Sequence, residues 1–171
     1  EITCLRVRTA SDEEDAVRRA ADMVREAAHQ HDVAVTLTDH YRLAGALGVD
    51  GVHLENPRIT VRDARKALGE DAIVGAFAGV SKHAGMTAAE AGADYVSLGP
   101  LVASALGDGE VAEPHLFAWW SEMIQTPVVA EGGLTLDMAR ALAPLVDFIG
   151  LDAAVWDHAA GPAGALKALN L

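Results

Sequence analysis

Short apolar runs rich in valine and isoleucine alternate along this chain with longer stretches of helical periodicity. Consecutive parallel strands need a crossover connection, usually a helix, so this alternation predicts repeated βα units and an α/β fold. The seven expected strands lie at residues 3–7, 34–38, 51–54, 72–77, 94–99, 127–132 and 148–152. The expected helices lie at residues 12–30, 41–47, 60–68, 85–91, 114–124, 136–145 and 162–169.

The first predicted helix has the clearest apolar stripe, with Ser11 placed to cap its N-terminus. The stripe consists of Ala16, Ala20, Met23, Val24 and Ala27. Three later turns share a pattern, a glycine near a helix end followed by an aspartate just before the next strand: Gly48-Val49-Asp50, Gly69-Glu70-Asp71 and Gly92-Ala93-Asp94. Glycine in such a place favours a left-handed exit from the helix.

The strand at 72–77 reads Ala-Ile-Val-Gly-Ala-Phe, so both of its faces are expected to be covered. A TIM (β/α)8 barrel provides helices outside the strands and a packed interior within them. A doubly wound open sheet has the same local pattern, but its first loop usually carries a Gly-x-Gly-x-x-Gly fingerprint, and this sequence has none. We therefore predict a single barrel domain over residues 1–171.

Seven strands are one fewer than the eight of such a barrel. The chain starts at Glu1, two residues before the first strand. We expect the first βα unit to be missing from its N-terminus.

The composition excludes several classes of partner. A net charge of −12, with no basic stripe, argues against nucleic acid, although a few arginines can still form a local site for a small anion. No apolar run is long enough to span a membrane and no basic, apolar leader opens the sequence, so a cytoplasmic protein is expected. The single cysteine, Cys4, excludes an internal disulfide.

Four motifs, in order and spacing, resemble the thiamine phosphate synthase family, which includes the thiazole tautomerases. They are Gly51-Val52-His53-Leu54, Gly79-Val80-Ser81-Lys82-His83, Ala93-Asp94-Tyr95-Val96-Ser97-Leu98-Gly99-Pro100 and Pro127-Val128-Val129-Ala130-Glu131-Gly132-Gly133. The resemblance implies small phosphorylated substrates and, in some members, a homodimer.

The resemblance also implies that the first strand of this chain holds a substrate diphosphate. The family has an inward-facing Gln-x-Arg-x-Lys there, and this chain has Cys4-Leu5-Arg6-Val7-Arg8. Alternation along a strand puts Arg6 and Arg8 on one face. The two guanidinium groups either bind an anion in the site or lie in water at the rim of the strand.

Thr38-Asp39 ends the next strand, where the family usually has Asn-Asp and uses the aspartate to hold magnesium. Asp39 is therefore a candidate metal ligand and Thr38 a candidate substrate contact, although Asp39 is equally placed to cap the helix at Tyr41. The best match to the family's second metal-binding aspartate is Arg58, which cannot ligate magnesium, so either the alignment slips in this loop or a guanidinium partly replaces the charge of the metal. Arg58 is instead a candidate substrate-binding residue, and the Mg²⁺ expectation depends on Asp39.

The resemblance assigns four further site residues. Ser81 matches a serine that contacts substrate phosphate, and His83 matches a histidine implicated in proton transfer in the tautomerases; a histidine titrates near neutral pH, although in a loop it is as often a structural hydrogen-bonder. Ser81 and His83 are therefore the catalytic candidates. Gly132 and Gly133 match a backbone-amide site for the thiazole phosphate.

Two departures from the family stand against this assignment. The family closes a Thr-x-Thr-Lys loop over the diphosphate, whereas this chain has Asp108 and Glu110 in a loop without lysine. Asp152 replaces a serine beside the expected thiazole phosphate, where its charge would repel a phosphate.

The leading hypothesis is a transferase that joins hydroxymethylpyrimidine diphosphate to thiazole phosphate and releases diphosphate. Two alternatives stay open. One is a thiazole tautomerase-like enzyme, in which His83 carries the proton. The other is a ligand-binding paralogue without catalytic activity.

Overall fold

The computed structural model describes residues 1–11 and 13–170, and it contains all seven predicted strands. The strands are β1 (Cys4–Val7), β2 (Ala34–Thr38), β3 (Gly51–Leu54), β4 (Ile73–Phe77), β5 (Tyr95–Leu98), β6 (Val128–Glu131) and β7 (Phe148–Gly150). The helices are α1 (Glu14–His29), α2 (Tyr41–Leu47), α3 (Val61–Leu68), α4 (Lys82–Glu90), α5 (Pro114–Met123), α6 (Leu136–Leu142), α7 (Ala153–Trp156) and α8 (Gly161–Leu169), with a 3-10 turn, η1 (Ala143–Leu145), after α6.

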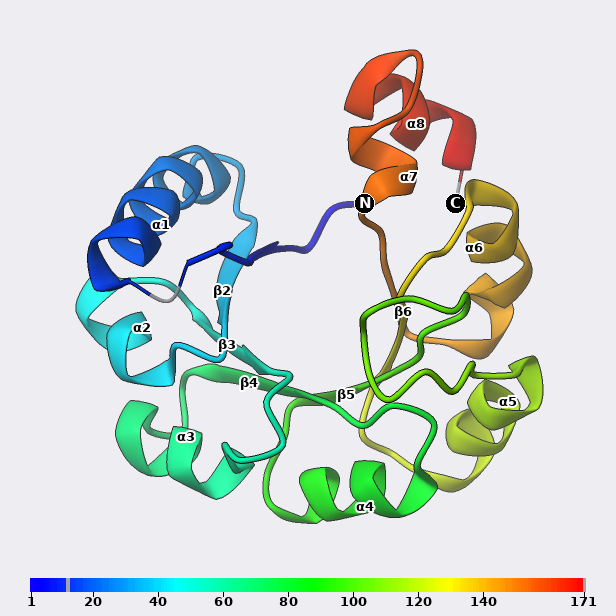
Figure 1. The fold of residues 1–171 in the computed structure, drawn as a ribbon, viewed down its shortest axis with the longest axis horizontal. Coiled ribbons are helices and arrows are strands. Elements are labelled where there is room, and N and C mark those ends of the chain that lie inside the picture. The colour runs from blue at the N-terminus through cyan, green and yellow to red at the C-terminus, as the bar shows by residue number, and fades with distance from the viewer. Residues whose placement is uncertain (12, 171) are drawn as a thin grey trace. The chain divides into compact units, whose positions relative to one another are not determined.

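The chain forms two compact units, Glu1–Ala76 with Ala91–Asp94, and Phe77–Glu90 with Tyr95–Leu171. In the first unit β1 to β4 pair in chain order and in parallel, and α1, α2 and α3 follow β1, β2 and β3 (Figure 1). In the second unit β5, β6 and β7 pair in the same way. None of the helices in the described residues combines the length and apolarity that crossing a bilayer requires.

Alternate strand positions have opposite characters. One set is apolar and buried, and includes Val35, Leu37, Val52, Val74, Val96 and Val128. The other set contains buried polar residues, namely Thr36, Thr38 and His53 in the first unit and Ser97 and Glu131 in the second. Side chains two apart on a strand share a face, so each unit has one face that buries apolar side chains and one that buries polar groups.

Aspartates just before three strands accept a hydrogen bond from the backbone N–H near the start of the neighbouring strand. The pairs are Asp50 with Val35 (2.7 Å), Asp94 with Val74 (2.7 Å) and Asp147 with Val128 (2.8 Å). In each pair the N–H of the aspartate donates in return to the carbonyl of the same valine. These reciprocal bonds anchor the amino ends of β2, β4 and β6. Asp71, the remaining aspartate of the predicted turn pattern, is exposed.

The first helix differs from its prediction. Its N-cap is Glu13, and Ser11 accepts a hydrogen bond from the Glu13 N–H without capping the helix; Asp12 lies outside the described residues. The buried face consists of Val17, Ala21 and Ala28, whereas Met23 is 78% exposed. The error has a simple cause, since alanines lie on several sides of this helix and give the stripe little contrast.

Other helices also differ from prediction, and α6 ends at Leu142 rather than at residue 145. α4 begins at Lys82, three residues before the predicted start, because Ser81 provides an N-terminal acceptor: its Oγ accepts from the Ala84 N–H at 3.1 Å. α7 was not predicted, because four residues are too few to show helical periodicity.

A close helix contact in the second unit depends on Gly85. A Cβ at this position would lie 2.5 Å from Cζ3 of Trp120, whose ring is fully buried and whose Nε1–H donates to the Thr126 carbonyl at 2.9 Å. Trp120 therefore packs within the hydrophobic core of this unit.

We predict that Gly85→Ala lowers the free energy of unfolding by about 1–3 kcal/mol, because the added methyl group overpacks the Trp120 ring. Gly45→Ala in α2 is the matched control, since its nearest neighbour would be Leu68 at 3.7 Å, and it should be neutral or stabilising by up to about 1 kcal/mol. Urea denaturation of both variants measures the difference. Equal stabilities would contradict this packing.

Candidate functional site

A small cavity opens at the carboxyl ends of β1, β2 and β3 in the first unit. It has a volume of about 190 Å³ and is lined by Arg8, Thr9, Thr38, Asp39, His40 and Glu55. The parallel register brings these segments together, because Arg6 lies beside Thr36 and Thr38 lies beside His53. Three of the predicted substrate-binding residues, Arg8, Thr38 and Asp39, therefore meet at one site.

The two arginines share one carboxylate, that of Glu55. Arg8 donates to Glu55 Oε1, and Nη1 of Arg6 lies 3.6 Å from the same oxygen. The side chain of Glu55 is 16% exposed, that of Arg6 21% and that of Arg8 55%. Arg6 is thus largely covered, whereas Arg8 reaches solvent.

Glu55 is the functional-site residue that the sequence reasoning missed. It directly follows Gly51-Val52-His53-Leu54, and β1 and β3 both pair with β2. A carboxylate after β3 and an arginine after β1, two strands that flank β2, could have indicated an ion pair at this site.

Asp39 organises the loop after β3. Its Oδ1 accepts from the backbone N–H of Glu55 at 2.7 Å and from that of Asn56 at 3.0 Å. Its backbone is left-handed, with φ of 61°, a conformation that aspartate tolerates better than most residues. The N-cap of α2 is His40, without a side-chain cap bond, so the alternative that Asp39 caps this helix is wrong.

Two hydroxyl groups in this cavity are buried, and neither Thr38 Oγ1 nor Thr9 Oγ1 has a hydrogen-bond partner within the described part of the chain. Thr38 is only 8% exposed. Buried polar groups are normally paired, so these hydroxyls provide donors for an oxygen-rich ligand.

The donor set at this cavity fits magnesium in the limited way that this ion usually binds. Among the residues described, no group of three or more His, Cys, Asp or Glu residues could hold a metal ion. Mg²⁺ commonly takes one or two carboxylates and completes its shell with water and substrate phosphate, and Asp39 offers such a carboxylate beside the Thr38 hydroxyl. Arg58 is exposed and is not one of the cavity-lining residues; its backbone N–H donates to Asn56 Oδ1.

The pKa of the Cys4 thiol, at the start of β1, lies above its ordinary value because partial burial disfavours the charged thiolate. Its Sγ lies 3.7 Å from Thr36 Oγ1. A thiol with a raised pKa is mostly protonated at neutral pH, which does not favour a nucleophilic role.

The remaining candidates lie in the second unit. Ser81 caps α4 through the bond to Ala84, and His83 lies exposed in the first turn of that helix. Its carbonyl accepts from the Thr87 hydroxyl, but the described contacts include no hydrogen bond or ion pair that orients the His83 ring. The structure therefore supplies no partner that prepares His83 for proton transfer.

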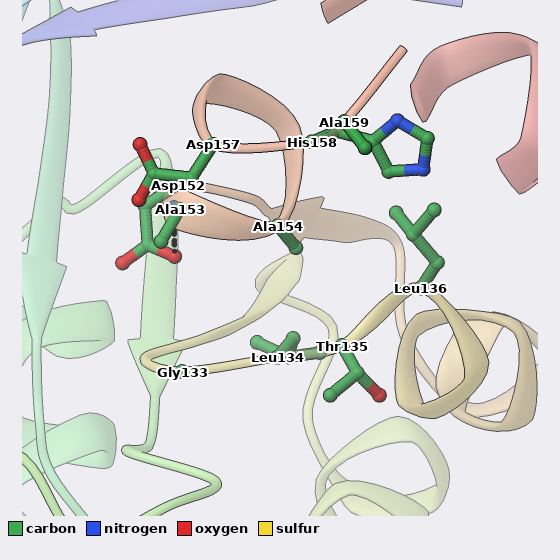
Figure 2. Close-up of a pocket in the computed structure, with 10 residues that line it drawn as sticks. All are labelled: Gly133, Leu134, Thr135, Leu136, Asp152, Ala153, Ala154, Asp157, His158 and Ala159. Carbon is green, nitrogen blue, oxygen red and sulfur yellow. Dashed lines mark hydrogen bonds between the residues drawn. The ribbon is translucent and has the colours of Figure 1, made fainter. Parts of the chain in front are cut away.

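A larger cavity, of about 510 Å³, follows β6 and β7 (Figure 2). Gly133, Leu134, Thr135, Leu136, Asp152, Ala153, Ala154, Asp157, His158 and Ala159 line it. Gly133, with φ of 73°, contributes backbone to this cavity, whereas Gly132 has a packing reason to be glycine. A Cβ on Gly132 would lie 2.7 Å from Cα of Pro100.

Asp152 has a structural role in this second cavity. Its Oδ1 accepts from the Ala153 N–H at 2.7 Å and so starts α7 (Figure 2). Asp157 also lines the cavity, and no lysine or arginine is among the lining residues. In the loop between β5 and α5, Asp108 and Glu110 are exposed, and Asp108 Oδ1 accepts a hydrogen bond from the Glu110 N–H. The acidic departures noted in the sequence are thus surface or helix-capping groups.

Comparison with known proteins identifies the family. The model of the family described as thiamine monophosphate synthase matches residues 1–152. A thiamine-phosphate synthase of Rhodospirillum centenum is 37% identical, over 99% of this chain and 83% of that protein. A second, from Hyphomonas neptunium, is 42% identical over 84% of this chain and 66% of that protein. The chain belongs to the thiamine monophosphate synthase family.

A solved structure has a similar fold. The thiamine phosphate pyrophosphorylase of Pyrococcus furiosus matches with a TM-score of 0.85 and 22% identity, over 99% of this chain and 85% of that one. The predicted α/β fold of the TIM-barrel type is confirmed by this likeness. The single-domain prediction and the missing first βα unit stay predictions.

We predict that Asp39→Ala lowers the free energy of unfolding by about 1–3 kcal/mol, because two loop N–H groups lose their acceptor and alanine disfavours a positive φ. Asp39→Asn is the matched control: it keeps an acceptor oxygen and tolerates the left-handed region, so it should stay within about 1 kcal/mol of the parent. Chemical denaturation measures both. A loss in Asp39→Asn equal to that in Asp39→Ala would show that charge, rather than the acceptor, stabilises the loop.

Proposed function

We propose that this protein is a thiamine phosphate synthase, a transferase that joins hydroxymethylpyrimidine diphosphate to thiazole phosphate and releases diphosphate. The observation that carries the proposal is the first-unit cavity, in a chain 37% identical to a synthase over nearly its whole length. Arg8, Asp39 and the Thr38 hydroxyl, which has no hydrogen-bond partner among the described residues, line it, and Arg6 contacts the lining residue Glu55.

In this proposal the cavity binds the diphosphate of the pyrimidine substrate. The guanidinium groups of Arg6 and Arg8 donate charge-assisted hydrogen bonds to its oxygens, and the Thr38 hydroxyl donates another. As the bond to the pyrimidine carbon breaks, negative charge grows on the leaving oxygen, and donors already in place stabilise it. The Arg6 side chain is the more buried of the two, since it is only 21% exposed and that of Arg8 is 55% exposed.

Magnesium, when bound, neutralises part of the diphosphate charge. We assign its protein ligand as Asp39. The carboxylate has a second task, since the same side chain holds the backbone of Glu55 and Asn56. Asp39 therefore both holds the loop after β3 in place and adds negative charge to the cavity.

The thiazole phosphate belongs, in this proposal, to the second unit. Gly133 offers backbone in the larger cavity, and Ser81 offers a hydroxyl at the start of α4. Asp152 and Asp157 add negative charge to that cavity, so we expect a higher KM for thiazole phosphate than for the pyrimidine diphosphate.

The proposal predicts that Arg8→Ala lowers kcat/KM for the pyrimidine diphosphate at least about tenfold, because a charge-assisted donor to the diphosphate is lost. The control is Arg18→Ala, which removes an exposed arginine paired with Glu14 on α1 and should leave activity unchanged. Formation of thiamine phosphate from both substrates, with magnesium and with a chelator, is the measurement.

Two outcomes would count against the proposal. If no thiamine phosphate forms with magnesium or with a chelator, and the protein nevertheless binds thiamine phosphate tightly, the result would favour a non-catalytic ligand-binding protein. Equal activity of Arg8→Ala and Arg18→Ala would remove the first-unit cavity from the reaction.

A further inference from the structure

We infer that Glu55 is a built-in competitor of the substrate: its carboxylate occupies Arg6 and Arg8 in the free protein and must leave them before an anion binds. The inference rests on the proposed function, which assigns these arginines to the diphosphate. It adds a residue that sets the affinity of the site for anions.

The carboxylate already stands where a ligand anion would bind. One oxygen, Oε1, accepts from Arg8 and lies 3.6 Å from Arg6 Nη1, and the side chain is only 16% exposed. A carboxylate and a phosphate oxygen use the same guanidinium donors. Two anions on one arginine pair would also repel each other strongly at such short range and partial burial. Glu55 and the ligand therefore bind in exchange.

The loop geometry permits this exchange without refolding. Asp39 holds the backbone N–H groups of Glu55 and Asn56, so the main chain at residue 55 stays anchored when the side chain moves. Glu55 follows β3 directly and lines the mouth of the cavity beside Arg8, which is 55% exposed. Rotation about the side-chain bonds of Glu55 is enough to bring its carboxylate into water.

This exchange has a functional consequence. A weakly bound anion, such as a single carboxylate, gains little by replacing an equivalent carboxylate that is already attached to the protein. A phosphate group, with more charge and more acceptor oxygens, gains more. Glu55 thus lowers the affinity for every anion but leaves only the more highly charged ligands able to occupy the arginines.

Calorimetric titration with inorganic pyrophosphate, in the presence of a chelator, tests the inference. Glu55→Gln should bind pyrophosphate about five- to tenfold more tightly than the parent, because the competing charge is gone while the side-chain shape is kept. The affinity for inorganic phosphate should rise by the same factor, since Glu55 must leave before either anion binds. Glu14→Gln, which removes the same charge from an exposed ion pair with Arg18, should change neither affinity.

Glu55→Asp gives an independent check if the Gln variant is poorly folded. The shorter carboxylate reaches the guanidinium groups less well, so anion affinity should rise by a smaller factor than in Glu55→Gln. A thermal melt of each variant confirms that folded protein is being compared.

Several results would overturn the inference. Unchanged or weaker pyrophosphate binding in Glu55→Gln and Glu55→Asp would show that Glu55 does not compete. Repeating the titrations with magnesium separates a further role: a loss of the magnesium-dependent gain in Glu55→Gln would make Glu55 a metal ligand instead. Failure of both parent and variants to bind pyrophosphate would overturn the proposed diphosphate site as well, whereas binding that is equal in all of them would overturn only the role of Glu55.

Discussion

The hydrogen bonds between aspartate carboxylates and strand N–H groups set the register on which the site depends. Asp50 links the start of β3 to Val35 of β2, and Asp147 does the same between β7 and Val128 of β6. A slip of one residue would exchange the two faces of a strand. With β2 and β3 held in register at their amino ends, the residues that leave their carboxyl ends fall at neighbouring positions, which is how Asp39 and Glu55 come to line one cavity.

The same register explains how an acidic chain brings two arginines together at neighbouring strand ends. The net charge is −12, yet Arg6 and Arg8 emerge two residues apart at the end of β1, both close to the Glu55 carboxylate. The partial burial of Arg6 and Glu55 strengthens their attraction, and the unpaired Thr38 hydroxyl adds a donor without adding charge. Local geometry, rather than overall charge, decides what this cavity attracts.

Much of this could be read from the sequence, and the failures have physical causes. All seven strands were predicted, because valine-rich runs bounded by turns give a strong local signal. The face of α1 was misplaced, because alanine contrasts weakly with its neighbours, and α7 was missed, because four residues carry no periodicity. These are limits of local pattern, and they do not affect the cavity of the first unit.

The site itself was predicted in part. Arg8, Thr38 and Asp39 were named and do lie together. Glu55 was missed and the hydrogen-bonding role of Asp39 was not foreseen, because both depend on which strands are neighbours and in what register, and a single sequence does not specify either. The capping roles of Ser81 and Asp152 were hidden for a related reason: the same side chain can end a helix or bind a ligand, and only its neighbours decide.

A crystal structure of the protein with pyrophosphate and magnesium is the most direct measurement of whether the first-unit cavity is the diphosphate site. We predict pyrophosphate oxygens within hydrogen-bond distance of Arg6, Arg8 and the Thr38 hydroxyl, with the Glu55 carboxylate turned away into solvent. Pyrophosphate bound elsewhere, with Glu55 still paired to both arginines, would contradict the assignment of this cavity.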